Sequence, residues 1–234
     1  MFRFKQFSVD QSGCAMKINT DGVLLGAIAS TGHAESILDI GTGTGVITLM
    51  LAQRFANAQI DAVEIDVSAA KTAEENFKNS VFDKRLHIFP QSVETFFKEH
   101  PDNKYDLIIS NPPFYLNSLE SPKEKKTLAK HTDADFFEGL MIGIAAHLSS
   151  KGLCWLILPV QTAELIKDIA MHNGLYQQRS ITIQSFENSD PHREIVCFGL
   201  EEMSVEKANF IIYVDRNKYT EEYKQLLQPY FIAF

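Results

Sequence analysis

One stretch of the chain decides its fold class. It reads Ser36-Ile37-Leu38-Asp39-Ile40-Gly41-Thr42-Gly43-Thr44-Gly45, a short apolar strand that runs into a loop with glycine at every second position. Val46, Leu49 and Met50 then recur at helical spacing, so the loop joins a strand to a helix. A glycine loop at such a junction is typical of nucleotide-type cofactor sites in α/β sheets, because glycine lets the backbone approach a ligand closely.

The spacing of these glycines argues against two other classes of nucleotide site. It is GxGxG and not the GxGxxG of the dinucleotide fingerprint, which disfavours a nicotinamide or flavin enzyme. No Lys-Ser or Lys-Thr pair follows the glycines, so the loop is not a phosphate-binding P-loop. Downstream, residues 60–64 predict a second strand that ends at Glu64. A carboxylate at that position can accept hydrogen bonds from both hydroxyls of a ribose.

A rigid turn follows a further buried strand. Residues 105–110 predict that strand, and the chain continues as Asn111-Pro112-Pro113-Phe114. The two prolines fix φ twice and remove two backbone donors, so the strand has to stop there. The turn offers an amide oxygen, the carbonyl of Pro112 and an aromatic ring to a planar group that carries an amine. An adenine edge, a guanine edge and a glutamine amide all meet that description, and the turn alone does not choose among them.

Taken together, these motifs resemble those of class I S-adenosylmethionine-dependent methyltransferases. The opening stretch Met16-Lys17-Ile18-Asn19-Thr20-Asp21-Gly22-Val23-Leu24-Leu25-Gly26 and the later Leu128-Ala129-Lys130-His131 are similar to the bacterial tRNA1(Val) adenine-37 N6-methyltransferase family. The resemblance implies S-adenosyl-L-methionine as the cofactor and tRNA as the substrate, with the adenine beside the valine-tRNA anticodon as the methylated base. It also implies that residues 111–114 form the catalytic turn.

The resemblance and the motifs together predict where the cofactor binds. Family members often have an acid near Ser92 that holds the adenine amine of the cofactor, and this chain departs from them there. The expected cofactor-binding residues are Asp21, Asp39, Gly41, Thr42, Gly43, Gly45, Glu64, Ile65 and Ser92.

The charge of the chain is unusual for a protein that binds nucleic acid. Thirty acidic and 22 basic residues give a net charge of −8, so the overall basic surface of such proteins is missing. Lysines gather directly after the catalytic turn, and we expect them to overhang the site and contact the tRNA, although a solvated helix face is the alternative interpretation. The expected substrate-binding residues are Lys125, Lys126, Lys130, His131 and Arg193.

The expected fold is α/β and Rossmann-like: a doubly wound, mostly parallel sheet of seven strands with an antiparallel closing strand. Residues 1–234 are expected to form one methyltransferase domain, in which 1–30 make a hairpin and helix that cap the site and 31–234 make the catalytic core. The hairpin is predicted from alternating apolar runs on either side of residues 10–13. Later strands are predicted at 86–89, 153–158, 177–186, 194–201 and 208–214. Two of the last three are expected to form an antiparallel pair, and the third has no assigned place. Helices are predicted at 137–148, 161–173 and 219–228.

The composition of the chain limits the classes of protein to which it can belong. The chain has 234 residues, of which 45% are hydrophobic and 22% charged, as expected for one globular domain. No apolar run approaches the roughly 20 residues of a membrane span, and the first residues do not look like a signal peptide, so we expect a cytoplasmic protein. Seven histidines and three cysteines show no metal-ligand spacing, and no metal is expected. The sequence does not determine the oligomeric state, and a monomer is favoured.

Other functions use the same turn. An RNA guanine-N2 methyltransferase and a protein-glutamine N5-methyltransferase are the enzymatic alternatives, and residues 16–26 favour tRNA adenine over both. A non-catalytic RNA-binding module is an alternative of another class. The intact Asn111, Pro112 and Phe114 argue against it.

Overall fold

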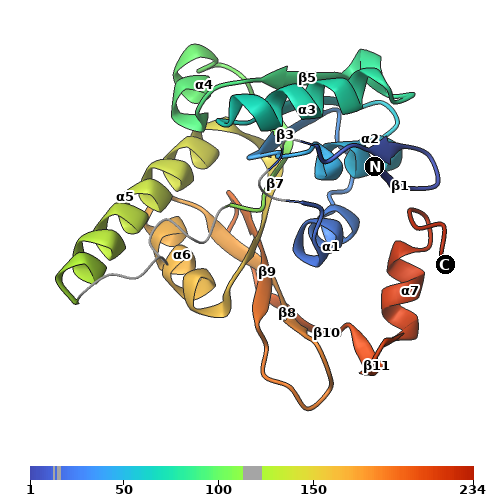
Figure 1. Cartoon of the computed structure of the whole chain (residues 1–234). Coiled ribbons are helices and arrows are strands. Elements are labelled where there is room, and N and C mark those ends of the chain that lie inside the picture. Colours follow the sequence, from blue (N-terminus) through green and yellow to red (C-terminus); the bar gives the residue numbers. More distant parts are fainter. Residues whose placement is uncertain (13, 15–16, 113–122) are drawn as a thin grey trace.

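A single twisted sheet forms the middle layer of the protein (Figure 1). The computed structural model describes residues 1–12, 14, 17–112 and 123–234, and of residues 123–133 it describes the backbone alone. Eight strands make up the sheet in the order β10-β8-β9-β7-β6-β3-β4-β5. The strands are β3 (Ser36–Ile40), β4 (Gln59–Val63), β5 (Leu86–Phe89), β6 (Tyr105–Ser110), β7 (Leu148–Leu158), β8 (Tyr176–Gln184), β9 (Arg193–Gly199) and β10 (Glu206–Ile211).

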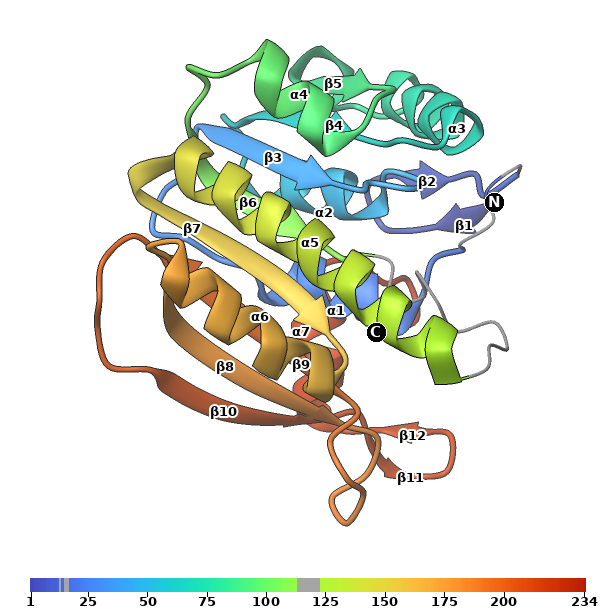
Figure 2. The same ribbon diagram turned by 90° about the vertical axis from the view of Figure 1, so that its left-hand side faces the viewer.

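Helices cover both faces of this sheet. The cluster of buried side chains on one face draws on α1, α2, α3 and α7, and the cluster on the other face on α4, α5 and α6, which lie in front in Figure 2. None of the described helices is long and apolar enough to cross a membrane. The helices are α1 (Thr20–Ile28), α2 (Val46–Arg54), α3 (Val67–Lys78), α4 (Val93–Glu99), α5 (Lys123–His147), α6 (Val160–His172) and α7 (Glu221–Leu227).

The central strands are apolar because both of their faces are buried. Successive side chains of a strand point to opposite faces, and on β3 the fully buried Ile37 and Leu38 belong to the two different clusters. Strands of parallel sheets covered by helices on both sides read as continuous apolar runs for this reason. The polar residues of the motifs are therefore confined to the ends of the strands.

The sheet has one strand more than the seven that the sequence predicts. The strand β9 is antiparallel to both β7 and β8, so the antiparallel strand lies inside the sheet. The later stretch without an assigned place is β10, which pairs in parallel with β8 from Glu206↔Arg179 to Ile211↔Gln184. This pairing satisfies the outer backbone groups of β8 and buries Phe210 against the core, which accounts for the additional strand.

The N-terminal hairpin exists, but the prediction of its turn at residues 10–13 is wrong. The two short strands are β1 (Phe2–Arg3) and β2 (Ser8–Val9), so the turn comprises residues 4–7. Phe4 and Phe7 stack at 4.5 Å between ring centroids, and both are buried in the core, which favours this earlier turn. Residue 14 and residues 17–19 belong to no strand, and residues 13, 15 and 16 lie outside the described part of the chain.

Candidate active site

Three neighbouring strands bring three of the predicted site segments to one edge of the sheet. The last residue of β3 is paired with the last residue of β4 on one side and with the last residue of β6 on the other. Gly41, Glu64 and Asn111 follow these strand ends directly, so they leave the sheet side by side, with the strands about 4.8 Å apart. Open α/β sheets bind their ligands at this carboxyl edge.

The glycine loop that follows β3 turns through three left-handed residues. Gly41, Gly43 and Gly45 have φ angles of 73°, 57° and 82°, a region that residues with a Cβ rarely adopt. The backbone N–H groups of Gly41 and Thr42 both donate to the carbonyl of Val63, at 2.8 and 3.1 Å. The protein's own backbone therefore fixes the loop to the end of β4.

These glycines differ in their surroundings. A Cβ on Gly41 or Gly43 would have no atom of the described residues within 4 Å, whereas a Cβ on Gly45 would lie 2.4 Å from Cε1 of Phe77. Gly41 and Gly43 thus border open space that a ligand can fill. Gly45 instead makes room for Phe77 of α3 to pack against the loop, and a contact of Gly45 with the cofactor stays a prediction.

Glu64 links the glycine loop to the start of α3. Its Oε2 accepts a hydrogen bond from the N–H of Gly43 at 2.8 Å, and its Oε1 accepts one from the N–H of Asp66, also at 2.8 Å. Each carboxylate oxygen has two lone pairs, so both retain the capacity to accept a ribose hydroxyl. Next to it, the side chain of Ile65 is 71% exposed and offers an apolar surface at the same edge.

Asp39 stabilises the loop from beneath. It is fully buried, and its Oδ2 accepts hydrogen bonds from the hydroxyls of Thr42 and Thr48, both at 2.7 Å. Its Oδ1 is buried and has no hydrogen-bond partner among the described residues. Burial raises the pKa of Asp39 to about 6, although the two threonine hydroxyls act in the opposite direction.

Two further residues hold the loop, and neither belongs to the sequence motifs. Thr48 of α2 is the second donor to Asp39. Asn76 of α3 donates from its Nδ2 to the carbonyls of Thr44 and Asp10, at 2.9 and 3.0 Å, and accepts from the N–H of Asp10 at 2.8 Å. Thr48 and Asn76 could have been identified because each is a polar residue on the otherwise apolar face of its helix.

Asn111 follows β6 beside the glycine loop. Its side chain is half-buried, and its Oδ1 is buried without a hydrogen-bond partner among the described residues. The preceding residue, Ser110, donates its hydroxyl to the carbonyl of Ile40 at 2.8 Å, which ties the end of β6 to the end of β3. Pro112 is buried, and the remaining predicted residues of the turn, Pro113 and Phe114, lie outside the described residues.

Ser92 forms the N-cap of α4. Its hydroxyl oxygen accepts a hydrogen bond from the N–H of Thr95 at 3.2 Å, as Ser does at many helix starts. This contact accounts for a serine at the position without reference to a ligand. Binding of the cofactor by Ser92 stays a prediction.

Asp21 and Arg193 were predicted to bind different ligands, and they contact each other. Oδ2 of Asp21, in the first turn of α1, lies 2.7 Å from Nε of Arg193, the first residue of β9. The side chains of Arg193 and Asp21 are 24% and 18% exposed. Because β9 is antiparallel to β7, with Glu194 opposite Leu158, Arg193 also lies at the carboxyl edge, two strands away from β6.

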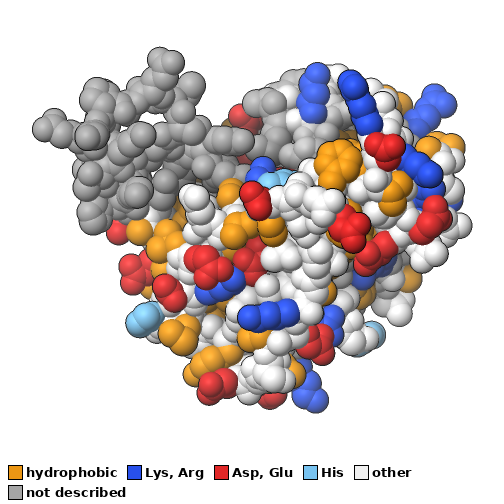
Figure 3. All heavy atoms as spheres, turned by 90° about the horizontal axis from the view of Figure 1, so that it is seen from below, with side chains coloured by type: hydrophobic (Ala, Val, Ile, Leu, Met, Phe, Trp, Pro, Cys, Tyr) orange, Lys and Arg blue, Asp and Glu red, His pale blue; other side chains and the backbone are white. Residues whose placement is uncertain are grey.

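Of the other predicted substrate-binding residues, only the backbone is described. Lys125, Lys126, Lys130 and His131 lie in the N-terminal part of α5, and their side chains are outside the described residues. Elsewhere, acidic and basic side chains are interspersed over most of the described surface that Figure 3 shows. Charge therefore does not by itself mark an RNA-binding region on the part of the surface seen in this view.

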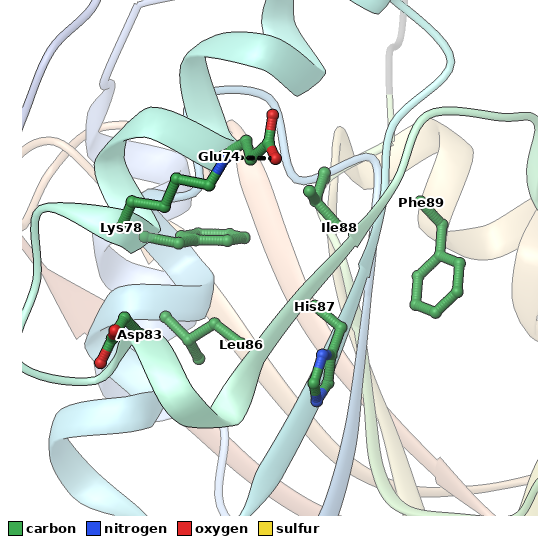
Figure 4. Close-up of a pocket in the computed structure, with 8 residues that line it drawn as sticks. Glu74, Lys78, Asp83, Leu86, His87, Ile88 and Phe89 are labelled. Carbon is green, nitrogen blue, oxygen red and sulfur yellow. Dashed lines mark hydrogen bonds and ion pairs between the residues drawn. The ribbon is translucent and has the colours of Figure 1, made fainter.

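A pocket of about 440 Å³ lies away from these residues, between α3 and the edge strand β5. Glu74 and Lys78 of α3 contribute an ion pair of 2.6 Å to its wall (Figure 4), and none of the predicted site residues lines it. Within the part of the chain that the structure describes, no group of three or more His, Cys, Asp or Glu residues is arranged to hold a metal ion. The polar groups that meet at the carboxyl edge remain the candidate active site.

Comparison with known proteins gives consistent results. Residues 16–159 match the family model of the methyltransferase small domain. A tRNA1(Val) (adenine(37)-N6)-methyltransferase of Pedobacter heparinus is 50% identical over 233 residues, covering 100% of this chain and 98% of that protein. A protein of the same name from Bacteroides thetaiotaomicron is 40% identical and covers 99% and 97% of the two chains.

Solved structures agree on the fold. The crystal structure of a predicted O-methyltransferase from Agrobacterium tumefaciens has a TM-score of 0.69 at 20% identity, covering 90% of this chain and 96% of that one. That of TrmN from Thermus thermophilus has a TM-score of 0.58 at 18% identity, covering 76% of this chain and 47% of that one. At these identities the likeness concerns the Rossmann-like fold alone.

Proposed function

The chain belongs to the methyltransferase small domain family and, within it, to the tRNA1(Val) (adenine(37)-N6)-methyltransferases, and we propose that it methylates the 6-amino group of adenine 37 in valine tRNA. The observation that carries the chemistry is the position of Asn111. Its Oδ1 is a buried hydrogen-bond acceptor without a partner among the described residues, directly beside the glycine loop. A buried acceptor costs free energy unless it receives a donor, and the amine of a bound base would supply one.

The residues at the ends of β3 and β4 suit S-adenosyl-L-methionine, which supplies an electrophilic methyl group on a sulfonium. Gly41 and Gly43 border open space, and the Glu64 carboxylate at its rim has acceptor capacity for the ribose hydroxyls. The exposed side chain of Ile65 would pack against the adenine of the cofactor. Asp39 would act through Thr42, by holding the loop in its left-handed conformation.

On the substrate side, Asn111 would accept one hydrogen of the adenine amine. The lone pair of that amine is delocalised into the ring, so the amine has to be held in one orientation for the nitrogen to attack. The Pro112 carbonyl would accept the second hydrogen, and Phe114 would stack on the flipped base. As the nitrogen gains positive charge, both acceptors stabilise it more strongly than they stabilise the neutral amine. The methylated ammonium is acidic enough to release its proton to water.

Full-length relatives at 36–50% identity favour adenine in tRNA over the alternatives that share the turn. A guanine amine and a glutamine amide fit the same two acceptors, so the product is the deciding measurement. A tRNA-modifying enzyme meets its substrate in the cytoplasm, where we expect this protein.

The test is to incubate the protein with unmodified valine tRNA and tritiated S-adenosylmethionine, and then to identify the labelled nucleoside. We expect N6-methyladenosine, and no labelling of a tRNA in which adenine 37 is replaced by guanosine. Labelled N2-methylguanosine, or label in a protein glutamine, would contradict the assigned substrate. Absence of any transfer, together with tRNA binding, would support the non-catalytic RNA-binding module instead.

A further inference from the structure

An aromatic protrusion extends from the carboxyl edge on the side away from the glycine loop. It consists of the loop between β8 and β9, residues 185–192, and the hairpin of β11 (Tyr213–Asp215) and β12 (Lys218–Tyr219). Both begin at the carboxyl edge, because Gln184 is the last residue of β8 and is paired with the last residue of β10. Backbone N–H groups of residues 212 and 213 donate to the carbonyls of residues 184 and 185, at 3.0 and 2.9 Å. Figure 2 shows the loop and the hairpin leaving the sheet together.

A row of stacked rings supports this protrusion. Tyr223 of α7 is buried and stacks on Tyr219 at 4.5 Å with an interplanar angle of 6°. Tyr219 stacks on Tyr213 at 5.0 Å, and Tyr213 contacts Phe186 at 5.6 Å. Phe186, at the outer end of the row, is 42% exposed. The row is thus anchored in the core at one end and open to solvent at the other.

The backbone that carries the exposed ring is held by its own loop. Ser189 donates from its N–H and its hydroxyl to the carbonyl of Phe186, at 3.0 and 2.8 Å, and its Oγ accepts from the N–H of Phe186 at 3.0 Å. The side chain of Gln184 donates to the carbonyl of Ser189. A backbone that is already fixed loses little conformational entropy on binding, so these contacts prepare the loop to present Phe186 to a planar ligand.

The protrusion is slightly acidic but carries two cations at its tip. Residues 185–192 and 213–219 contain three acidic and two basic residues, which gives a net charge of −1. Arg216 and Lys218 are exposed on either side of Asn217, which has a φ of 59° at the tip of the hairpin. The two cations therefore stand at the tip of a weakly acidic protrusion.

We propose that the aromatic protrusion binds the tRNA substrate outside the active site, with an unpaired base of the anticodon loop stacked on Phe186 and neighbouring phosphates on Arg216 and Lys218. The inference rests on the proposed function for the identity of the RNA. From β6 to β8 is three strand spacings, roughly 15 Å, so the protrusion lies close enough to contact nucleotides that flank the target base. Stacking needs no strongly positive surface, so this contact accounts for RNA binding by an acidic protein.

The experiment compares Phe186→Ala with Met171→Ala, which changes an exposed apolar side chain on α6, in the wild-type background. We expect Phe186→Ala to weaken binding of a valine-tRNA transcript about tenfold, as the removal of one stacked base does, with S-adenosylmethionine affinity unchanged in calorimetry. Phe186→Tyr should retain most of the affinity because it keeps the stacking face. Equal tRNA affinities for wild type and Phe186→Ala would overturn the proposal.

A second pair of variants keeps the proposal testable if Phe186→Ala fails to fold. Arg216→Gln with Lys218→Gln should weaken tRNA binding and lower the slope of log affinity against log salt by about 0.7 for each phosphate that is no longer neutralised. Lys84→Gln with Lys151→Gln, two exposed lysines at the opposite edge of the sheet, is the matched control and should leave the slope unchanged. An unchanged slope in the first pair would contradict the phosphate contacts. Wild-type protein that binds tRNA without methylating it would instead contradict the proposed function alone.

Discussion

On the proposed cofactor half of the carboxyl edge, formed by the ends of β3 and β4, the polar groups are largely bonded to one another. The proposed substrate half, from β6 to β10, contains bonded groups as well, but also a buried acceptor and an aromatic ring that are open to a ligand. The N–H groups of Gly41, Thr42 and Gly43 donate to the end of β4 and to Glu64. Oδ1 of Asn111 is without a partner among the described residues, and the ring of Phe186 is exposed. The proposed cofactor half is therefore fixed in advance, while the proposed substrate half keeps binding capacity that is available to a ligand.

The largest effect should follow from Asn111→Ala. Removing an acceptor that stabilises developing charge typically costs 10²- to 10³-fold in rate, or about 3–4 kcal/mol. Because the glycine loop is held by the end of β4 and by Glu64, we expect S-adenosylmethionine affinity to stay within a few-fold of wild type. Single-turnover methylation of valine tRNA and calorimetry measure the two quantities.

Asn79→Ala, at the exposed C-terminal end of α3, is the matched control and should behave as wild type. Full activity of Asn111→Ala would show that the unpaired acceptor has no role in the reaction.

The next effect concerns Asp39, whose unpaired Oδ1 is the exception among the described residues of the cofactor half. Its pKa is about 6 in the folded protein and near 3.8 ordinarily, so the folded chain keeps its proton to higher pH than the unfolded chain does. The contribution of Asp39 to the free energy of unfolding therefore declines as pH rises from about 4 to about 6, by up to about 3 kcal/mol.

Asp39→Asn removes this titration and retains an oxygen for Thr42 and Thr48. The stability of the variant relative to wild type should thus increase between pH 4 and pH 7, as measured by urea unfolding at several pH values across that range. Parallel pH profiles of the two proteins would show that Asp39 does not titrate in this range.

A smaller effect is expected for Glu64→Ala. Hydrogen bonds to a charged group contribute about 1.5–3 kcal/mol, so the affinity for S-adenosylhomocysteine should fall roughly 10- to 100-fold in calorimetry. Glu75→Ala, an exposed carboxylate on α3, controls for the change in net charge. An unchanged affinity for Glu64→Ala would mean that the carboxylate does not contact the cofactor.

The sequence predicted best those elements whose pattern has a single physical solution. The strands at 36–40 and 105–110 occur with the predicted bounds, since buried apolar runs that stop at a glycine loop or a proline turn fit few other structures. The edge strand at 86–89 also occurs with the predicted bounds. The N-terminal turn was misplaced because alternation in residues 2–9 is compatible with more than one pairing. The partner of β10 could not be predicted, because an edge strand is placed by backbone groups that another strand leaves open.

In the candidate site, too, the sequence predicts the residues that follow a recognisable strand but not the contacts between separate elements. The glycine loop, Glu64 and Asn111 could be found because each follows a predictable strand in a parallel sheet, and the register places them side by side. The support that Asn76 gives to the loop depends on packing between elements, which spacing does not encode. The contact between Asp21 and Arg193 joins residues 172 positions apart and could not be foreseen from either motif.

The smallest effect on stability is expected from the ion pair between Asp21 and Arg193, whose variants also test where the cofactor half ends and the substrate half begins. The side chains of this pair are 24% and 18% exposed, so the pair is intermediate between surface ion pairs, which contribute about 0–1 kcal/mol to stability, and buried ones. A double-mutant cycle of Asp21→Asn and Arg193→Gln should therefore give a coupling free energy of unfolding of about 1 kcal/mol. The more exposed Lys78–Glu74 pair should give a smaller coupling free energy.

If Arg193 belongs to the substrate half, Arg193→Gln should weaken tRNA binding a few-fold and leave S-adenosylmethionine affinity unchanged. A drop in cofactor affinity in Arg193→Gln as large as in Asp21→Asn would instead assign the pair to the cofactor half, because the arginine would then act by holding Asp21 at the cofactor.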